Sequence, residues 1–288
     1  MRRKNYQKPT ELKSLHEIKL MREAGILVAK ALKLCRQMAK PGIRTIEIDQ
    51  AVEAMFASSN AIPLFKGYAG FDDETPPYPA STCISINEQV VHGIPGNRVL
   101  KEGDIVSFDT ACKLNGWCAD AAITVPVGTV RPERLRLIRI AEETLAIAVR
   151  EIGRRKYWSE VAKQMEKHSH LAGYSLVENF VGHGIGRSMH EQPQVVNFIP
   201  RDRKGLEEFD FRLEPGLVLA IEPMLNMGKV EVEILADHWT VVTKDGYPSA
   251  HVEHTVAITE NGVEILTLQE TEPSNSSTTS QLATNRLG

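Results

Sequence analysis

The stretch IVSFDTACKLNGWCADAAITVPV, residues 105–127, decides the fold that we expect for this chain. β-branched and aromatic residues fill both of its arms, and Asn115-Gly116 stands between them. This dipeptide favours a two-residue type I′ turn, so the stretch predicts a β-hairpin. With that turn, Asp109 faces position 122 and Asp120 lies two places along on the same side. The two carboxylates are then diagonal neighbours with Cβ atoms somewhat under roughly 7 to 8 Å apart, and a metal ion fits between them.

Helical patterns stand on both sides of this hairpin. A capping box, Ser14-x-x-Glu17, begins a helix with apolar residues three and four apart, and Pro41-Gly42 ends it. Thr45 then caps a second helix that continues to about Ser58. The pattern next predicts a loop over residues 62–78, helices over 132–150 and 159–173, and strands over 175–181, 217–221 and 251–258.

The order helix, link, helix, strand therefore occurs twice, which suggests an internal duplication. The passages RTIEIDQAV and KYWSEVAKQ occupy corresponding places, although they share few residues. We expect one domain over residues 14–268, with halves of about 14–130 and 131–268. Residues 1–13 form a polar tail in this interpretation. The last segment, 269–288, has almost nothing apolar to bury and is expected to be disordered.

Composition indicates a soluble globular protein. The 288 residues are 42% apolar and 25% charged, with a net charge of -3, so no broad attraction to DNA is expected. The short basic patch at the start is interpreted as a solvated tail. It has no apolar segment behind it and the chain has no membrane-length apolar run, so we expect a cytoplasmic protein. The cysteines do not form a zinc-binding pair and are expected to be free thiols: Cys35, Cys83, Cys112 and Cys118.

Five acidic or imidazole side chains lie on or beside the expected strands: Asp109, Asp120, His183, Glu222 and Glu253. Three of them, Asp109, Glu222 and Glu253, interrupt apolar surroundings. A buried charge without a partner is costly, so something positive should compensate these groups. An arginine or lysine beside each acid is the simpler explanation for any single one. All five together favour metal, and two divalent cations neutralise four carboxylates. Oxygen ligands with one imidazole and no thiolate indicate Mn, Fe, Co or catalytic Zn.

Several motifs resemble the signature blocks of type I methionine aminopeptidases, in the same order and over residues 14–268. They are the hairpin and the four segments CISINEQVVHGIP from Cys83, GHGIGRSMHEQPQV from Gly182, IEPM from Ile221 and VEHT from Val252. The resemblance implies an α/β (α+β) "pita-bread" fold, in which two pseudo-symmetric halves surround a central, largely antiparallel sheet. It implies removal of the N-terminal methionine from nascent proteins by a metal-activated hydroxide at a dinuclear site.

The resemblance also implies a role for each site residue. The two metal ions are held by the five side chains that the burial argument selected: Asp109, Asp120, His183, Glu222 and Glu253. Glu222 further transfers the proton, and His92 and His190 contact the substrate and stabilise the intermediate. The remaining pocket residues are Tyr68, Tyr78, Cys83 and Trp239; by pattern alone, Tyr68 and Trp239 could equally be core aromatics. A monomer that acts on chains emerging from the ribosome is implied as well.

Two departures from the family pattern and two rival functions bear on this reading. Residues 71–77 resemble an insertion in the loop that bears the pocket tyrosines, and Met189 stands where the family often has an aromatic residue.

One rival function is a proline-directed aminopeptidase of the same fold. Such enzymes usually have a long N-terminal domain, for which the residues before the first helix are too few. The other is a non-catalytic binding module, which would lose ligands that this chain keeps. No H-E-x-x-H or G-x-S-x-G motif offers another route.

Overall fold

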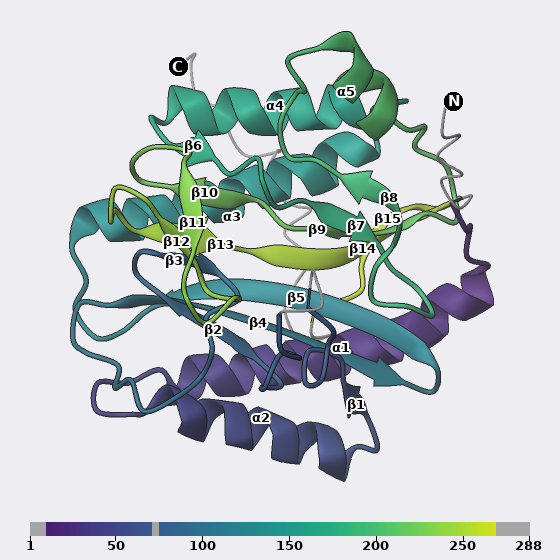
Figure 1. Cartoon of the computed structure of the whole chain (residues 1–288). Helices are drawn as coiled ribbons and strands as arrows, with labels where there is room; N and C mark the ends of the chain where they lie inside the picture. The colour runs from purple at the N-terminus through teal and green to yellow at the C-terminus, as the bar shows by residue number, and fades with distance from the viewer. Residues whose placement is uncertain (1–9, 71–74, 269–288) are drawn as a thin grey trace, which may run out of the picture.

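A curved antiparallel sheet forms the centre of the fold, and two pairs of helices pack against it (Figure 1). The computed structural model describes residues 10–70 and 75–268. Within them the helices are α1 (Leu15–Met38), α2 (Thr45–Ser58), α3 (Pro132–Ile152), α4 (Trp158–Leu171) and the short α5 (Arg203–Phe209). Both pairs pack on the same face of the sheet, along opposite halves of it: Ala121 in the core of α1 and α2 and Ile221 in the core of α3 and α4 both pair with His254, and paired residues share a face.

In the described ranges the main sheet has nine strands, ordered β1-β4-β5-β14-β9-β7-β8, with β2 beside β4 and β15 beside β14. Its strands are β1 (Ile62–Pro63), β2 (Cys83–Ile86), β4 (Ile105–Leu114), β5 (Trp117–Pro126), β7 (Gly182–Gly184), β8 (Glu191–Val195), β9 (Val218–Ile221), β14 (Glu253–Thr259) and β15 (Gly262–Ile265). Two smaller sheets contain β3 (Gln89–Val91), β6 (Ser175–Leu176), β10 (Met224–Asn226), β11 (Val232–Ile234), β12 (Val241–Thr243) and β13 (Ser249–His251).

The predicted hairpin is confirmed residue by residue. Strands β4 and β5 pair with Asp109 opposite Ala122 and Ala111 opposite Asp120. Asn115 and Gly116 have φ angles of 51° and 82°, as a type I′ turn requires. The register predicted from the turn is therefore the register of the sheet at its centre.

Each helix pair has its own hydrophobic core against the sheet. One core joins α1 and α2 to β4 and β5, with Phe56 and Phe108 completely buried. The other joins α3 and α4 to β9 and β14, around Trp158 and Leu219. Burying one such large apolar side chain contributes roughly 1.5–3 kcal/mol, so both helix pairs are anchored firmly to the sheet. The residue limits proposed for the two halves stay a prediction.

The capping box of α1 is confirmed, but three other boundaries differ from expectation. Arg44, not Thr45, is the N-cap of α2, because the Thr45 hydroxyl instead bonds to the backbone of Gly96. The strand expected over 175–181 ends after two residues, because β10 offers it only a short pairing edge. The strand expected over 251–258 is divided at Val252 into β13 and β14, which belong to different sheets.

The polar segments at the ends gave one correction. Lys13 does not belong to a solvated tail: it is 5% exposed and forms an ion pair with Glu191. This long-range partner could not be recognised from local pattern. The rest of the basic patch and the C-terminal tail lie outside the described residues. All four cysteines are buried free thiols, as predicted, and no described helix has the length and apolarity to cross a membrane.

Candidate metal centre

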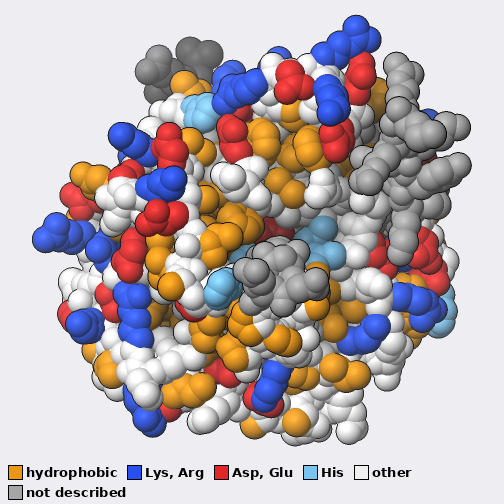
Figure 2. Space-filling model, in the orientation of Figure 1, with side chains coloured by type: hydrophobic (Ala, Val, Ile, Leu, Met, Phe, Trp, Pro, Cys, Tyr) orange, Lys and Arg blue, Asp and Glu red, His pale blue; other side chains and the backbone are white. Residues whose placement is uncertain are grey.

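The five side chains predicted to bind metal converge on one cavity of about 860 Å³. Three strands of the main sheet and the residue after a fourth carry the acids, and β7 carries His183. Histidine and acidic side chains gather near the centre of the face shown in Figure 2. The remaining predicted site residues line the same cavity: Tyr68, Tyr78, Cys83, His92, His190 and Trp239.

The strand register explains this convergence. Ala122 on β5 pairs with Asp109 on one side and with Glu253 on the other, so these two acids face the same surface of the sheet. Asp120 lies two residues from Ala122 and shares that surface, because side chains alternate along a strand. His183 faces Ala220, and Glu222 is two residues further along. Side chains alternate between the two faces of each strand, and the register of the neighbouring strands therefore places all five groups on the same face of the sheet.

The site fits a metal cation. Ligand atoms of Asp120, His183 and Glu253 lie within 4.8 Å of one another. Buried oxygens of Asp109, Asp120 and Glu253 have no hydrogen-bond partner among the described residues. Of the described residues that line the cavity, none is a lysine or arginine. The alternative in which basic side chains neutralise the acids is therefore wrong. A bound metal cation would supply the positive charge that these acids need.

Burial and mutual repulsion hold protons on these acids in the metal-free protein. Burial raises the pKa of Asp120 to about 7 and that of Glu222 to about 8. Burial, followed by the neighbouring carboxylates, raises the pKa values of Asp109 and Glu253 well above their usual range. Binding of a cation must therefore displace protons near neutral pH, and lower pH should weaken it.

We expect the metal-free protein to lose stability as the pH rises from 6.5 to 8. Carboxyl pKa values that are higher in the folded than in the unfolded state stabilise the fold at low pH, and that contribution is lost as pH rises through about 7 and 8. The histidines act oppositely, since burial lowers the pKa of His183 and His251 to about 3 and that of His92 and His254 to about 4. Most of their contribution is already present at pH 6.5, and each adds only about 0.4 kcal/mol above it, less than the carboxyl groups remove.

The expected decrease in the free energy of unfolding is on the order of 2 kcal/mol over this interval. Urea unfolding in the presence of a chelator, at half-unit pH steps, measures it. Saturating divalent metal should abolish the decrease, because the cation replaces the protons. A metal-free protein whose stability rises between pH 6.5 and 8 would contradict the raised pKa values of the carboxyl groups.

The hydrogen bonds of two histidines orient their rings. Nδ1 of His183 lies 2.9 Å from the carbonyl oxygen of Gly184 and donates to it, which leaves the Nε2 lone pair facing the acids. His190 lies at the cavity edge, with its ring 4.3 Å from that of His183. The Tyr68 hydroxyl is 2.6 Å from His190 Nδ1, so Tyr68 orients His190 besides lining the cavity.

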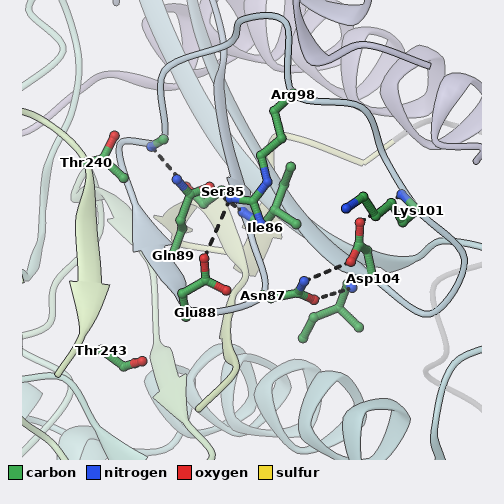
Figure 3. A network of polar contacts seen from close by, with 12 residues as sticks. Ser85, Ile86, Asn87, Glu88, Gln89, Arg98, Lys101, Asp104, Thr240 and Thr243 are labelled. Atoms are coloured by element: carbon green, nitrogen blue, oxygen red, sulfur yellow. Dashed lines mark hydrogen bonds and ion pairs between the residues drawn. The ribbon is translucent and has the colours of Figure 1, made fainter. Parts of the chain in front are cut away.

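His92 follows a rigid turn. It adopts a left-handed conformation, with φ of 59°, which is uncommon for a residue with a side chain. The preceding β2–β3 turn is held by the polar network in Figure 3, where Asn87 donates to Asp104 and the backbone of Ile86 donates to Gln89. This network fixes the direction in which the chain delivers His92 to the cavity.

An apolar wall adjoins the acids. It consists of Phe65, Tyr78, Ala80, Cys83, Ala111, Met189 and Trp239. The rings of Tyr78 and Trp239 meet edge to face at 5.2 Å, and the Trp239 indole donates to the carbonyl oxygen of Pro76. The cavity therefore combines one charged end with one apolar end. Of the segment 71–77, which resembles an insertion, residues 71–74 lie outside the described residues.

Three residues that support or line the site were missed from sequence. Asp49 of α2 accepts hydrogen bonds from the backbones of Ser81 and Thr82, immediately before β2, and its position as a buried acid on an apolar helix face was a usable signal. Phe180 contacts the ring of His92. His251 lies 3.5 Å from Glu222, and only the tertiary structure reveals that contact.

Comparisons with known proteins agree with this geometry. Residues 19–260 match the model of metallopeptidase family M24. A methionine aminopeptidase of Clostridium perfringens is 46% identical over 257 residues, covering 89% of this chain and 98% of the relative. The crystal structure of methionine aminopeptidase from Thermotoga maritima is 37% identical, with a TM-score of 0.82, and covers 91% of this chain and 100% of that chain. Prolidase from Pyrococcus furiosus shares the fold at 21% identity, with a TM-score of 0.68, covering 91% of this chain and 66% of that chain.

Proposed function

Because the chain belongs to the methionine aminopeptidases of metallopeptidase family M24, which have the pita-bread fold, we propose a role in that reaction for each group in the cavity. The protein is a metal-dependent hydrolase that removes the first methionine from polypeptides. The observation that carries the proposal is the convergence of four unneutralised acids and one imidazole beside an apolar wall.

We propose that two divalent ions, Co, Mn, Fe or Zn, occupy the charged end. The residues that would hold them are Asp109, Asp120, His183, Glu222 and Glu253. Two dications balance four carboxylates, which supports that number over one. When bound, the ions supply a water of lowered pKa as the nucleophile and a Lewis acid for the scissile carbonyl.

The side chains around the charged end would handle the proton and the substrate. Glu222 accepts the proton of the nucleophile and passes it to the departing amine, a role that its position at the cavity supports. His190, oriented by Tyr68, donates a hydrogen bond to the carbonyl oxygen as negative charge develops there. His92 contacts the substrate from the wall beside Trp239.

The apolar end would bind the methionine side chain. Tyr78, Cys83 and Trp239 are each almost fully buried, and Tyr68 and His92 complete the proposed lining. Full burial of a methionine side chain contributes roughly 1.5–3 kcal/mol to binding. Met189 joins this wall, and its flexible thioether is compatible with a methionine-shaped pocket.

The two rival functions have less support. The chain's identity to the methionine aminopeptidase of C. perfringens, 46%, is about twice its identity to the prolidase, 21%. A binding module without catalysis has no need of five converging ligands. The proposals that the protein acts as a monomer, in the cytoplasm and on chains emerging from the ribosome, rest on the family resemblance alone.

Release of methionine from Met-Ala-Ser tests the proposed function. The protein is stripped of metal, titrated separately with Mn, Co, Fe and Zn, and compared on Met-Ala-Ser, Leu-Ala-Ser and a proline-first peptide. We expect release that requires metal, saturates near two equivalents in the proposed dinuclear site and strongly favours methionine.

The Trp239→Ala variant provides the pocket control in the same assay. It should keep the metal titration and reduce the preference for methionine over leucine, because Trp239 lies in the apolar wall. Saturation at one equivalent would contradict the dinuclear proposal. Metal binding without turnover of any peptide would favour the binding module, and cleavage of the proline-first peptide would favour the other aminopeptidase.

A further inference from the structure

His251 is a buried histidine that none of the proposed roles uses. It ends β13 and is 1% exposed, and β13 separates from β14 at the next residue. Its ring nitrogen Nε2 lies 3.5 Å from Oε2 of Glu222. Nε2 has no hydrogen-bond partner within the described residues, so Glu222 is the group that it can serve.

The two oxygens of Glu222 face different partners. Oε1 lies 3.8 Å from Nε2 of His183, on the side of the ligand cluster, whereas Oε2 faces His251. The backbone oxygen of Glu222 also accepts a hydrogen bond from the Asn197 amide, at 3.2 Å. The Asn197 bond fixes the backbone of Glu222, and a contact on Oε2 would fix the direction of its carboxylate.

The backbone of His251 is itself fixed by the central hairpin. Its N–H donates to the Thr124 hydroxyl at 3.0 Å, and that hydroxyl donates to the His251 carbonyl oxygen at 2.7 Å. The Ser107 hydroxyl lies 2.8 Å from that of Thr124 and supports it. Such rigid support is typical of residues that orient a metal ligand, because a loosely held partner could not fix the ligand's direction.

We propose that His251 is a positioning residue that donates a hydrogen bond from Nε2 to Oε2 of Glu222, leaving Oε1 directed at the ligand cluster. This inference rests on the proposed function of Glu222. A carboxylate that binds metal is ionised and can only accept hydrogen bonds, so the imidazole must be the donor. The present separation exceeds a normal hydrogen bond by a few tenths of an ångström, which a small side-chain rotation removes.

Two variants of His251 and one matched control test the role. His251→Leu keeps similar bulk without a donor, and His251→Gln keeps an N–H donor. His254→Leu is the control, because His254 is the next histidine along the chain, bonds to the Thr267 hydroxyl at 2.8 Å and does not line the cavity. We measure kcat and KM on Met-Ala-Ser and, independently of turnover, the affinity for Mn by calorimetry.

We expect His251→Leu to lower kcat and Mn affinity by about 10- to 100-fold each, with KM nearly unchanged. His251→Gln should restore both to within roughly threefold of the wild type. The proposal would be overturned if His251→Leu had the same kcat and the same Mn affinity as the wild type. An equal loss in the His254→Leu control would also overturn it, because it would indicate a general effect on the sheet.

Nitrogen NMR of the histidine-labelled wild-type protein keeps the test valid if His251→Leu does not fold. The His251 signals are assigned by their absence in His251→Gln. We expect a neutral ring protonated on Nε2 when Mg or Zn, which are diamagnetic, is bound; protonation on Nδ1 overturns the proposal. The Mn affinity and the ring tautomer can be measured without peptide cleavage. A wild-type protein without turnover would therefore refute the proposed function, but the role of His251 could still be tested.

Discussion

The Asp120→Asn variant is expected to lose its metal and at least roughly a thousandfold of kcat/KM on Met-Ala-Ser. Asp120 is one of three residues whose ligand atoms lie within 4.8 Å of one another, and its buried oxygen has no other partner. The substitution keeps the shape of the side chain and removes its charge. Metal analysis by mass spectrometry and steady-state kinetics measure the two losses.

The same variant should be more stable than the wild type above about pH 7, where Asp120 is ionised, when both are free of metal. Asp120 repels the buried carboxylates around it, so removing its charge relieves a cost that only a cation otherwise offsets. Asp49→Asn is the matched control, because Asp49 is also buried but lies outside the cavity lining. The control should keep its metal. An Asp120→Asn protein with wild-type metal content and turnover would refute the assignment of Asp120 as a ligand.

Gly25→Ala is expected to destabilise the protein by about 3 kcal/mol, although alanine is the better helix former. A Cβ on Gly25, inside α1, would lie 2.1 Å from the carbonyl oxygen of Leu266. That backbone segment cannot move freely, because the Arg22 side chain donates to the carbonyl oxygens of both Ile265 and Leu266. Urea unfolding of the metal-loaded protein measures the loss.

Gly153→Ala is the control for the effect of a glycine-to-alanine change alone. Gly153 has right-handed φ and ψ angles at the end of α3, and a Cβ there would lie 3.4 Å from the Val263 side chain and 3.9 Å from the Arg150 carbonyl oxygen, without a clash. We expect its stability to change by less than roughly 1 kcal/mol. Equal stability of Gly25→Ala and the wild type would show that the backbone after β15 is not in close contact with α1 at Gly25.

Local pattern was sufficient for the elements that carry the site. The Asn115-Gly116 turn set the register of β4 and β5, and with it the shared face of Asp109 and Asp120. The acids were recognisable because they interrupt apolar strands, where a charge needs compensation. The start of α1 followed from its capping box.

Boundaries that depend on a partner strand were not predictable in the same way. Whether the chain after Ser175 continues as a strand depends on the length of β10, which is far away in sequence. The division at Val252 similarly depends on distant strands, because β13 pairs with β10 in a small sheet and β14 pairs with β5 and β9 in the main sheet. A buried Lys13 also needed its distant partner, Glu191, before it could be distinguished from a solvated lysine.

The sequence by itself determined the hairpin, the set of candidate ligands and, through its motifs, the family, because these depend on spacing within short segments. The tertiary structure alone decided that no lysine or arginine among the described cavity residues neutralises the acids, that Tyr68 orients His190 and that His251 faces Glu222. Such contacts join residues 29 to 122 positions apart, and their existence depends on how the strands are ordered across the sheet. Periodicity within one strand predicts which face a side chain occupies, but not which side chain from another strand will lie beside it.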